Sequence, residues 1–288
     1  VATKVSPSGL KLQYNYSATN NFLVSIVDGD TPSTVFWTPN TIDAAGRVTV
    51  DTIGATSGSS QFKTTRSFDA NRGWLNSTDS RLVSGNAPRF AQTIGHDARG
   101  NVTNRSTTTA ATAGTLDEVA TYDNLDRMLT LITTPAAVPA VPALPTKTIA
   151  YSGDGNITSK SDVGTYTYGS ATVRPHAVTA AAGKSYSYDA NGNVVLRGGK
   201  AFTYNNANMP EAGFTDATTT NINAAVAWWA YNTGNRRSKQ VAGGITTRYY
   251  AGGTWRENTA TSIKLRDYIA TPGGGTVEVM SDSTGGPF

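Results

Sequence analysis

The stretch SYSYDANGNVV, residues 185–195, combines strand signals with a turn signal. Tyr186 and Tyr188 are two residues apart, so in an extended chain both rings lie on the same face. The Asn-Gly pair that follows tolerates the positive φ angles of a tight hairpin turn, and the valines after it resume a strand. The stretch therefore predicts one β-hairpin.

Degraded copies of this phrase recur along the chain at irregular intervals. Their consensus is an aromatic residue, Asp, two variable residues, Gly, Arg or Asn, and an aliphatic residue. Such self-similarity indicates a repeat architecture in which each unit packs against its neighbours. The copies begin at Ile42, Phe68, His96, Tyr122, Tyr151, Tyr188, Tyr204 and Tyr231.

The tolerance of the repeat to drift favours a structural role. The aromatic ring is expected to fill a layer, with His96 as a packed substitute for Tyr, and the Asp to cap its own turn through side-chain to backbone hydrogen bonds. The Asp is replaced by Ser152, Asn205 and Asn232, and Asp126 stands where Gly is expected, so ligand binding or proton transfer is disfavoured. The predicted repeat residues are Asp43, Gly46, Phe68, Asp69, His96, Asp97, Gly100, Tyr122, Asp123, Tyr151, Gly155, Tyr186, Tyr188, Asp189, Gly192, Tyr204 and Tyr231.

These residues resemble the YD repeats, named for their Tyr-Asp pair, of the bacterial RHS (rearrangement hot spot) proteins. YDNLDRM from Tyr122, HAV at 176–178 after GTYTYG, and the run from Arg248 to Met280 resemble the late part of an RHS repeat region. The resemblance covers nearly the whole chain, most securely Ile42 to Met280. It implies an all-β fold of YD-repeat hairpins in a continuous, coiled antiparallel sheet, either a spiral shell or a β-solenoid-like form.

Composition agrees with an all-β chain. Charged residues make up 15% of the sequence, against roughly 25% in typical soluble domains, and glycine is abundant. The best helix candidate, INAAVAWWAYN from Ile222, is short and ends in aromatic residues, so we interpret it as a strand. We expect a single repeat domain over residues 1–288. Residues 133–146 contain four prolines, which cannot donate to a strand ladder, and are expected to form an inserted loop.

The resemblance implies a noncatalytic structural segment of a secreted or cell-surface bacterial protein. In similar proteins the sheet forms part of a hollow shell that encloses a toxin or other cargo. Such proteins usually continue into an Asp-His-Leu-Gly-Ser segment, an autoproteolytic region and a variable toxin, none of which follows here. The expected partners are therefore the remainder of a longer parent polypeptide and its enclosed cargo.

Two other functions stay open. The terminal segments TVEVMSDSTGG and VATKV carry little charge, so exposed strand edges there could pair head to tail with further copies and build a fibre. Exposed aromatic side chains could instead bind glycans. The candidate glycan contacts are Trp37, Trp74 and Trp255.

Several classes of chemistry receive no support. The absence of cysteine excludes disulfides and thiolate chemistry, and no nucleophile elbow, phosphate loop or dinucleotide motif occurs, so no enzyme activity or cofactor is predicted. The acidic stretches around Asp28, Asp30 and Asp154 lack the spacing of a calcium loop, so no metal is predicted.

Nucleic-acid binding and membrane insertion are also disfavoured. The net charge is +4, but the cations are scattered, and GNRRSK at 234–239 is their densest group. A nucleic-acid binder usually concentrates its basic residues in one patch. No apolar run reaches the roughly 18 residues that a membrane span needs.

Overall fold

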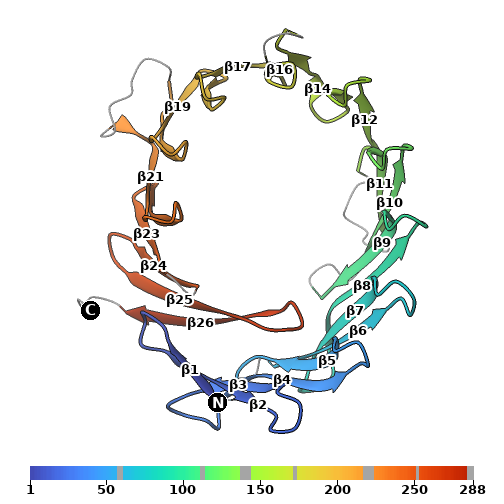
Figure 1. Ribbon diagram of the computed structural model, residues 1–288, viewed down its shortest axis with the longest axis vertical. Helices are drawn as coiled ribbons and strands as arrows, with labels where there is room; N and C mark the ends of the chain where they lie inside the picture. Colours follow the sequence, from blue (N-terminus) through green and yellow to red (C-terminus); the bar gives the residue numbers. More distant parts are fainter. Residues whose placement is uncertain are drawn as a thin grey trace. The chain divides into compact units, whose positions relative to one another are not determined.

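The chain folds into two compact units made almost entirely of strands and turns (Figure 1). A computed structural model describes residues 1–56, 61–110, 114–136, 144–170, 174–216, 224–250 and 253–283. One unit comprises Val1–Ile149 with Tyr268–Glu278, and the other comprises Ala150–Asp267 with Val279–Phe288. The described residues contain no α-helix.

Strands follow one another in chain order within two sheets, and the strand pairs in the described residues are antiparallel. The all-β, hairpin-built prediction is confirmed. The first sheet contains β1 (Ala2–Val5), β2 (Lys11–Tyr16), β3 (Leu23–Asp28), β4 (Val35–Ile42), β5 (Val48–Ile53), β6 (Phe62–Phe68), β7 (Leu75–Leu82), β8 (Pro88–His96), β9 (Val102–Thr109), β10 (Thr115–Tyr122), β11 (Met128–Ala136), β12 (Lys147–Tyr151), β13 (Ile157–Lys160) and β14 (Gly164–Thr165).

A single residue separates the last strand of the first sheet from the first strand of the second. It contains β15 (Thr167–Tyr168), β16 (Val178–Ala181), β17 (Lys184–Tyr188), β18 (Val194–Arg197), β19 (Lys200–Tyr204), β20 (Pro210–Gly213), β21 (Ala227–Tyr231), β22 (Arg237–Ala242), β23 (Ile245–Tyr249), β24 (Thr254–Asn258), β25 (Ile263–Ala270) and β26 (Thr276–Ser283).

Burial alternates along strands that present one face to a core. In β25, Leu265, Asp267 and Ile269 are buried, whereas the residues between them are less so, as the two-residue period of a strand requires. The core of the first unit includes Ile26 and Trp37, which are 0% and 1% exposed. In the second unit, Phe214 packs with Ala201 and Ala212 in a separate cluster.

The segment from Ile222 follows the strand interpretation where it is described. Ala227–Tyr231 forms β21, which pairs with β20 on one side and β22 on the other. Residues 222 and 223 lie outside the described residues. Pairing with two neighbouring strands, together with aromatic residues that favour strands, keeps this segment extended.

The sheet reaches further into the proline-rich stretch than the sequence indicates. Strand β11 runs to Ala136, and Pro135 pairs with Leu116 of β10. On its other side β11 pairs with β12 at Thr130 and Leu131. Residues 137–143 of the expected loop lie outside the described residues.

Candidate functional site

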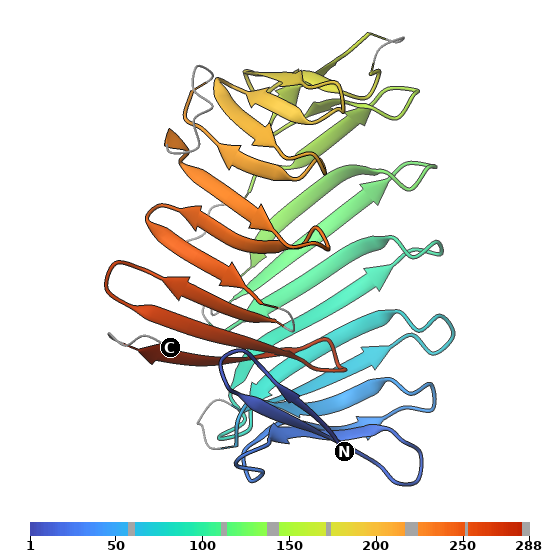
Figure 2. The ribbon, with the colours of Figure 1, turned by 60° about the vertical axis from the view of Figure 1, so that its left-hand side comes forward.

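Within each unit, the turns that carry the repeat consensus lie at the same end of the hairpins (Figure 2). In most consensus hairpins a β-bulge lies immediately before the aromatic position, so that Tyr204, for example, pairs with Pro210. A bulge kinks the strand and re-aims the side chain next to it. The same irregularity precedes Phe68, His96, Tyr122, Tyr188 and Tyr231.

The aspartate of the consensus closes its own turn. The Asp189 Oδ1 accepts hydrogen bonds from the N–H groups of Asn191 at 3.0 Å and Asn193 at 2.8 Å, and Oδ2 accepts one from the Asn193 side chain at 2.8 Å. Asp43, Asp97 and Asp123 make the same contacts with their turns, using Arg47, Asn101 and Arg127. Asp69 accepts from two N–H groups of a turn that is one residue longer.

Turns that lack aspartate keep the same acceptor geometry. Asn205 Oδ1 accepts from the N–H groups of Ala207 at 2.9 Å and Met209 at 3.1 Å, and Ser152 Oγ accepts from the N–H of Asn156 at 3.1 Å. An oxygen acceptor, with or without charge, is therefore sufficient to close the turn. This explains the drift of the repeat at these positions.

The glycine position requires a left-handed backbone. Its φ is 91° at Gly192, 97° at Gly100, 79° at Gly46 and 91° at Gly155. Where glycine is missing, Asp126, Asn208 and Asn235 take φ values of 61°, 58° and 54°. Asn and Asp are the residues other than glycine that most readily adopt this conformation.

Sequence reasoning missed further copies of this turn. In the turn between β25 and β26, the N–H of Thr271 donates to the carbonyl of Gly275 at 2.9 Å and the N–H of Gly274 donates to the carbonyl of Thr271 at 3.0 Å, with Gly274 at φ 81°. Similar closures occur at Ser6 and Tyr250. Their glycines were the available signal, because Thr271, Ser6 and Tyr250 stand where the consensus has Asp.

Five tyrosine hydroxyls each join their hairpin to the one before it. The Tyr204 hydroxyl donates to the carbonyl of Val194 at 3.0 Å, and Val194 pairs directly with the preceding tyrosine, Tyr188. Equivalent bonds run from Tyr122 to Val102, from Tyr168 to Ile157, from Tyr188 to Val178 and from Tyr231 to Pro210, at 2.7–2.8 Å. We call these bonds the tyrosine ladder.

Burial affects the ionisation of the ladder. It raises the pKa of the Tyr122, Tyr168, Tyr188 and Tyr204 hydroxyls above their usual value. The hydroxyls therefore remain protonated donors at neutral pH, and a raised folded-state pKa adds stability that is fully present below about pH 10 and is lost as pH rises further.

We expect Tyr204→Phe to lower the free energy of unfolding by about 0.5–1.5 kcal/mol, because it removes the hydroxyl that donates a hydrogen bond to the carbonyl of Val194. Urea denaturation measures this difference. Tyr16→Phe is the control, since Tyr16 is 43% exposed and no ladder bond joins it to a described residue. Equal effects of the two variants would contradict the role of the ladder.

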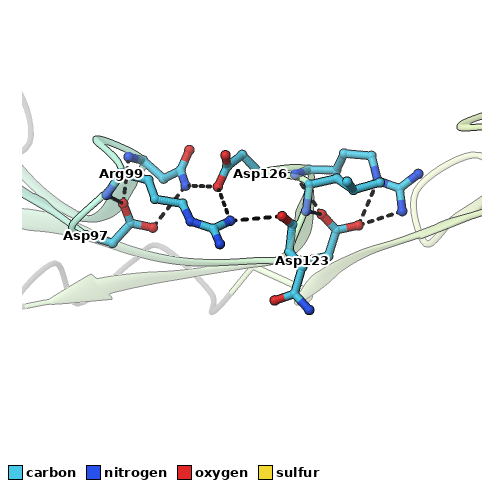
Figure 3. A network of polar contacts seen from close by, with 8 residues as sticks. Asp97, Arg99, Asp123 and Asp126 are labelled. Carbon is cyan, nitrogen blue, oxygen red and sulfur yellow. Dashed lines mark hydrogen bonds and ion pairs between the residues drawn. The ribbon is translucent and has the colours of Figure 1, made fainter.

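Neighbouring turns of the first unit are also joined by polar side chains (Figure 3). The Asp126 Oδ1 accepts from Arg99 Nη1 at 3.1 Å and from Asn101 Nδ2 at 2.8 Å, and Arg99 also donates to the carbonyl of Asn124 at 2.9 Å. The residue at the glycine position thus binds the preceding turn.

The second unit repeats this arrangement with amides. The Asn208 Oδ1 accepts from the side-chain nitrogens of Asn191 and Asn193, each at 2.9 Å. Asn156 donates to the carbonyl of Pro175 at 3.0 Å, and His176 Nδ1 lies 2.8 Å from Asn156 Oδ1. In both units, side-chain hydrogen bonds therefore join neighbouring turns.

Hydrogen bonds lower the pKa of the turn aspartates. For Asp189 and Asp97 the largest cause is the bond from the side chain at the Arg/Asn position, and for Asp43 it is the backbone N–H of Arg47. A lowered folded-state pKa contributes stability above the unfolded pKa of about 3.9. This contribution is lost as pH falls through the folded-state pKa.

We therefore expect the urea midpoint to fall when pH is lowered from about 5 to about 3. Asp189→Asn should reduce the steepness of that fall, because Asn keeps an acceptor, as Asn205 does, but cannot be protonated in this range. A wild-type midpoint that does not change with pH in this range would contradict the prediction.

Three further repeat aromatics, Phe68, His96 and Tyr186, contact cations or another ring. The Arg47 guanidinium lies 4.5 Å from the Phe68 ring centre, and His96 lies 5.2 Å from Trp74. Arg197 lies 5.8 Å from the Tyr186 ring, and Tyr151 ends β12 in a half-buried position. Phe68 and His96 have no phenolic hydroxyl and cannot extend the tyrosine ladder.

A buried ion pair lies inside the first unit. Asp51 is 0% exposed, and its carboxylate accepts from Arg66 Nη1 at 2.8 Å and from Trp37 Nε1 at 2.9 Å. Trp37 is itself 1% exposed, so it has no surface to offer a glycan, which corrects the expectation for this residue. We call Trp37, Asp51 and Arg66 the Asp51 cluster.

The turn between β25 and β26 covers the Asp51 cluster. A Cβ added to Gly273 would lie 2.6 Å from Asp51 Oδ2 and 2.9 Å from the Arg66 guanidinium nitrogens. Only glycine allows the backbone to approach the ion pair this closely. The turn and strands β5–β8 border an open groove of about 570 Å³ that includes Phe62, Phe68 and Phe90.

The other predicted glycan contacts lie in different environments. Trp74 is half-buried, with Arg72 4.8 Å from its ring centre, whereas Trp255 is 38% exposed and meets Tyr249 edge to face at 5.3 Å. Trp74 belongs to the first unit and Trp255 to the second.

Among the described residues, no group of three or more His, Asp or Glu side chains could hold a metal ion. The described part of the chain also contains no helix long and apolar enough to cross a membrane.

The family model of the teneurin YD-shell matches residues 44–222. The chain belongs to this family. The resemblance to YD-repeat proteins is thereby confirmed, and this YD-shell chain is a structural shell segment.

Solved structures share the YD-shell fold at low sequence identity. TcdB2-TccC3 without its hypervariable C-terminal region is 16% identical with a TM-score of 0.69, and the match covers 99% of this chain and 15% of that chain. The Tc holotoxin pore of Photorhabdus luminescens is 15% identical with a TM-score of 0.59, over 96% of this chain and 16% of that chain. The YD-shell chain thus spans about a sixth of the solved chains or less. No curated protein matches the sequence.

Proposed function

We propose that this YD-shell chain is a noncatalytic part of a shell wall that encloses a cargo polypeptide. The observation that carries the proposal is the tyrosine ladder, in which each hydroxyl binds the hairpin before it. A ladder that joins neighbours along the chain extends a sheet without any closed active site. Repeat proteins gain stability from such contacts between neighbouring units.

The described polar groups of the repeat are used in building the wall. The turn aspartates bind their own turns, and the cross-turn amides bind the next turn. A catalytic carboxylate needs an open substrate position and a pKa tuned toward the working pH, whereas these pKa values are lowered. The wall is therefore proposed to have a mechanical role.

The proposed partners are the rest of a longer parent polypeptide and its enclosed cargo. The solved shells are parts of much longer chains, which supports such a parent. We further propose that the parent is secreted or displayed on a bacterial cell surface, where an enclosed toxin would be delivered.

A fibre is the second candidate, favoured by the ends of the sheets. Strand β1 pairs with β2 and has no strand on its outer side among the described residues; Val1, which precedes it, and Val5, its last residue, are 85% and 64% exposed. An unpaired apolar edge can accept a strand from another copy. Lys4 is the only charged residue in β1.

Electron microscopy of the parent polypeptide as isolated, together with its intact mass, distinguishes these functions. Closed hollow particles with a mass well above 30.2 kDa would support the enclosing wall. Regular fibres built from a 30.2 kDa chain would overturn it and make the β1 edge the functional site.

A further inference from the structure

Three cations lie side by side across the second sheet. Lys239 of β22 pairs directly with Arg248 of β23, and Arg248 pairs directly with Arg256 of β24. Directly paired residues project from the same face, with Cβ atoms about 4.5–5.5 Å apart. We call Lys239, Arg248 and Arg256 the cation row.

The cation row is unfavourable for the sheet by itself, because like charges directly opposite each other repel. Elsewhere the chain matches cations with acids across strands, as in Arg105 with Glu118 and Arg66 with Asp51. Within the described residues, no member of the cation row forms an ion pair. The repulsion is therefore left uncompensated by the wall.

The acidic residues closest along the neighbouring strands are used elsewhere. Glu257 alternates to the opposite face, where it lies 3.7 Å from Arg266. Asp267 shares the face of the cation row but is 5% exposed and accepts the Thr254 hydroxyl at 2.6 Å. Arg248, at the centre of the row, is exposed and makes no side-chain hydrogen bond to another described residue.

We propose that the cation row binds an acidic segment of polypeptide. Arginine guanidinium groups present donors that match carboxylates in paired hydrogen bonds, and a row of them suits successive Asp or Glu side chains. This surface exists whether or not the chain encloses cargo, so the inference goes beyond the proposed function.

The aromatic neighbour of the row argues against single-stranded nucleic acid. Nonspecific binders of that class stack bases on free aromatic faces next to cations. Trp228 lies beside the row, but Lys239 Nζ sits 4.4 Å from its ring centre and covers that face. Carboxylates need no such platform.

Fluorescence anisotropy with a labelled oligoglutamate peptide and the full chain tests the inference at low salt. We expect Arg248→Gln to weaken binding on the order of tenfold, as the loss of a charge-assisted contact does. Lys264→Gln is the matched control. The substitution also removes one positive charge, but Lys264 pairs with Glu257 on the opposite face of the same sheet. It should leave the affinity unchanged.

Each outcome decides the inference. Failure of oligoglutamate to bind, or equal weakening by both variants, would overturn it. Tighter binding of an oligothymidylate of equal charge would also overturn it and favour nucleic acid. As a second readout, Arg248→Gln should raise the urea midpoint of the free chain at low salt by relieving repulsion, and a lower midpoint would contradict the uncompensated row.

Discussion

Asp51→Asn is expected to lower the free energy of unfolding by about 3–5 kcal/mol, because one partner of a buried ion pair is removed. Arg66, whose side chain is 9% exposed, would keep its charge without a counterion. Arg66 and Trp37 donate to different oxygens of the carboxylate, and in Asn one of these positions becomes an NH2 donor, so one of the two hydrogen bonds is lost. Urea denaturation monitored by tryptophan fluorescence measures the loss.

Asp79→Asn is the matched control for this prediction. Asp79 also binds an arginine, Arg81, at 2.8 Å, but the two side chains are 38% and 42% exposed. Surface ion pairs contribute about 0–1 kcal/mol, so the control should change stability little. Similar losses in the two variants would show that burial of the Asp51 cluster is not what makes it stabilising.

Gly273→Ala is expected to destabilise the first unit by about 1–3 kcal/mol through overpacking. The new Cβ would lie 2.6 Å from Asp51 Oδ2, and the carboxylate cannot move away because both its oxygens hold hydrogen bonds. The turn between β25 and β26 would have to lift from the Asp51 cluster. Amide hydrogen exchange at Thr271 and Gly274 should therefore increase.

Gly153→Ala is the control for the glycine prediction. Nothing lies within 4 Å of a Cβ added there. Replacing glycine at a compatible position should be neutral or slightly stabilising, because it restricts the unfolded chain. If Gly273→Ala behaved in the same way, the close seating of the turn on the ion pair would be refuted.

The hairpin repeat could be predicted from sequence because its signals are local. Strand alternation, the acceptor side chain and the residue with positive φ all act within one turn, as Tyr188, Asp189 and Gly192 show. The same local signal survives where the letters change, since Asn205 still closes its turn and Asn208 still takes the left-handed backbone. These physical requirements are few, so they tolerate drift.

The contacts between distant segments could not be predicted in the same way. Nothing in the residues around Gly273 indicates that they lie on Asp51, because that contact depends on how the chain is folded as a whole. The tyrosine ladder needed the bulge register before each ring could be matched to the carbonyl of Val194 or Val178. The cation row likewise could be recognised only once the strand pairing was known, because its three residues come from three different strands.

The enclosing role is tested most directly by protease protection of the parent polypeptide. The parent's segments that do not belong to the wall, including the cargo, can be followed by mass spectrometry during digestion, in the wild type and in the Asp51→Asn variant. The account predicts that the cargo segment resists the protease while the wall is folded and is digested faster in the variant. If every segment that does not belong to the wall, including the cargo, were digested at the same rate in the wild type and in the variant, an enclosing wall would be contradicted.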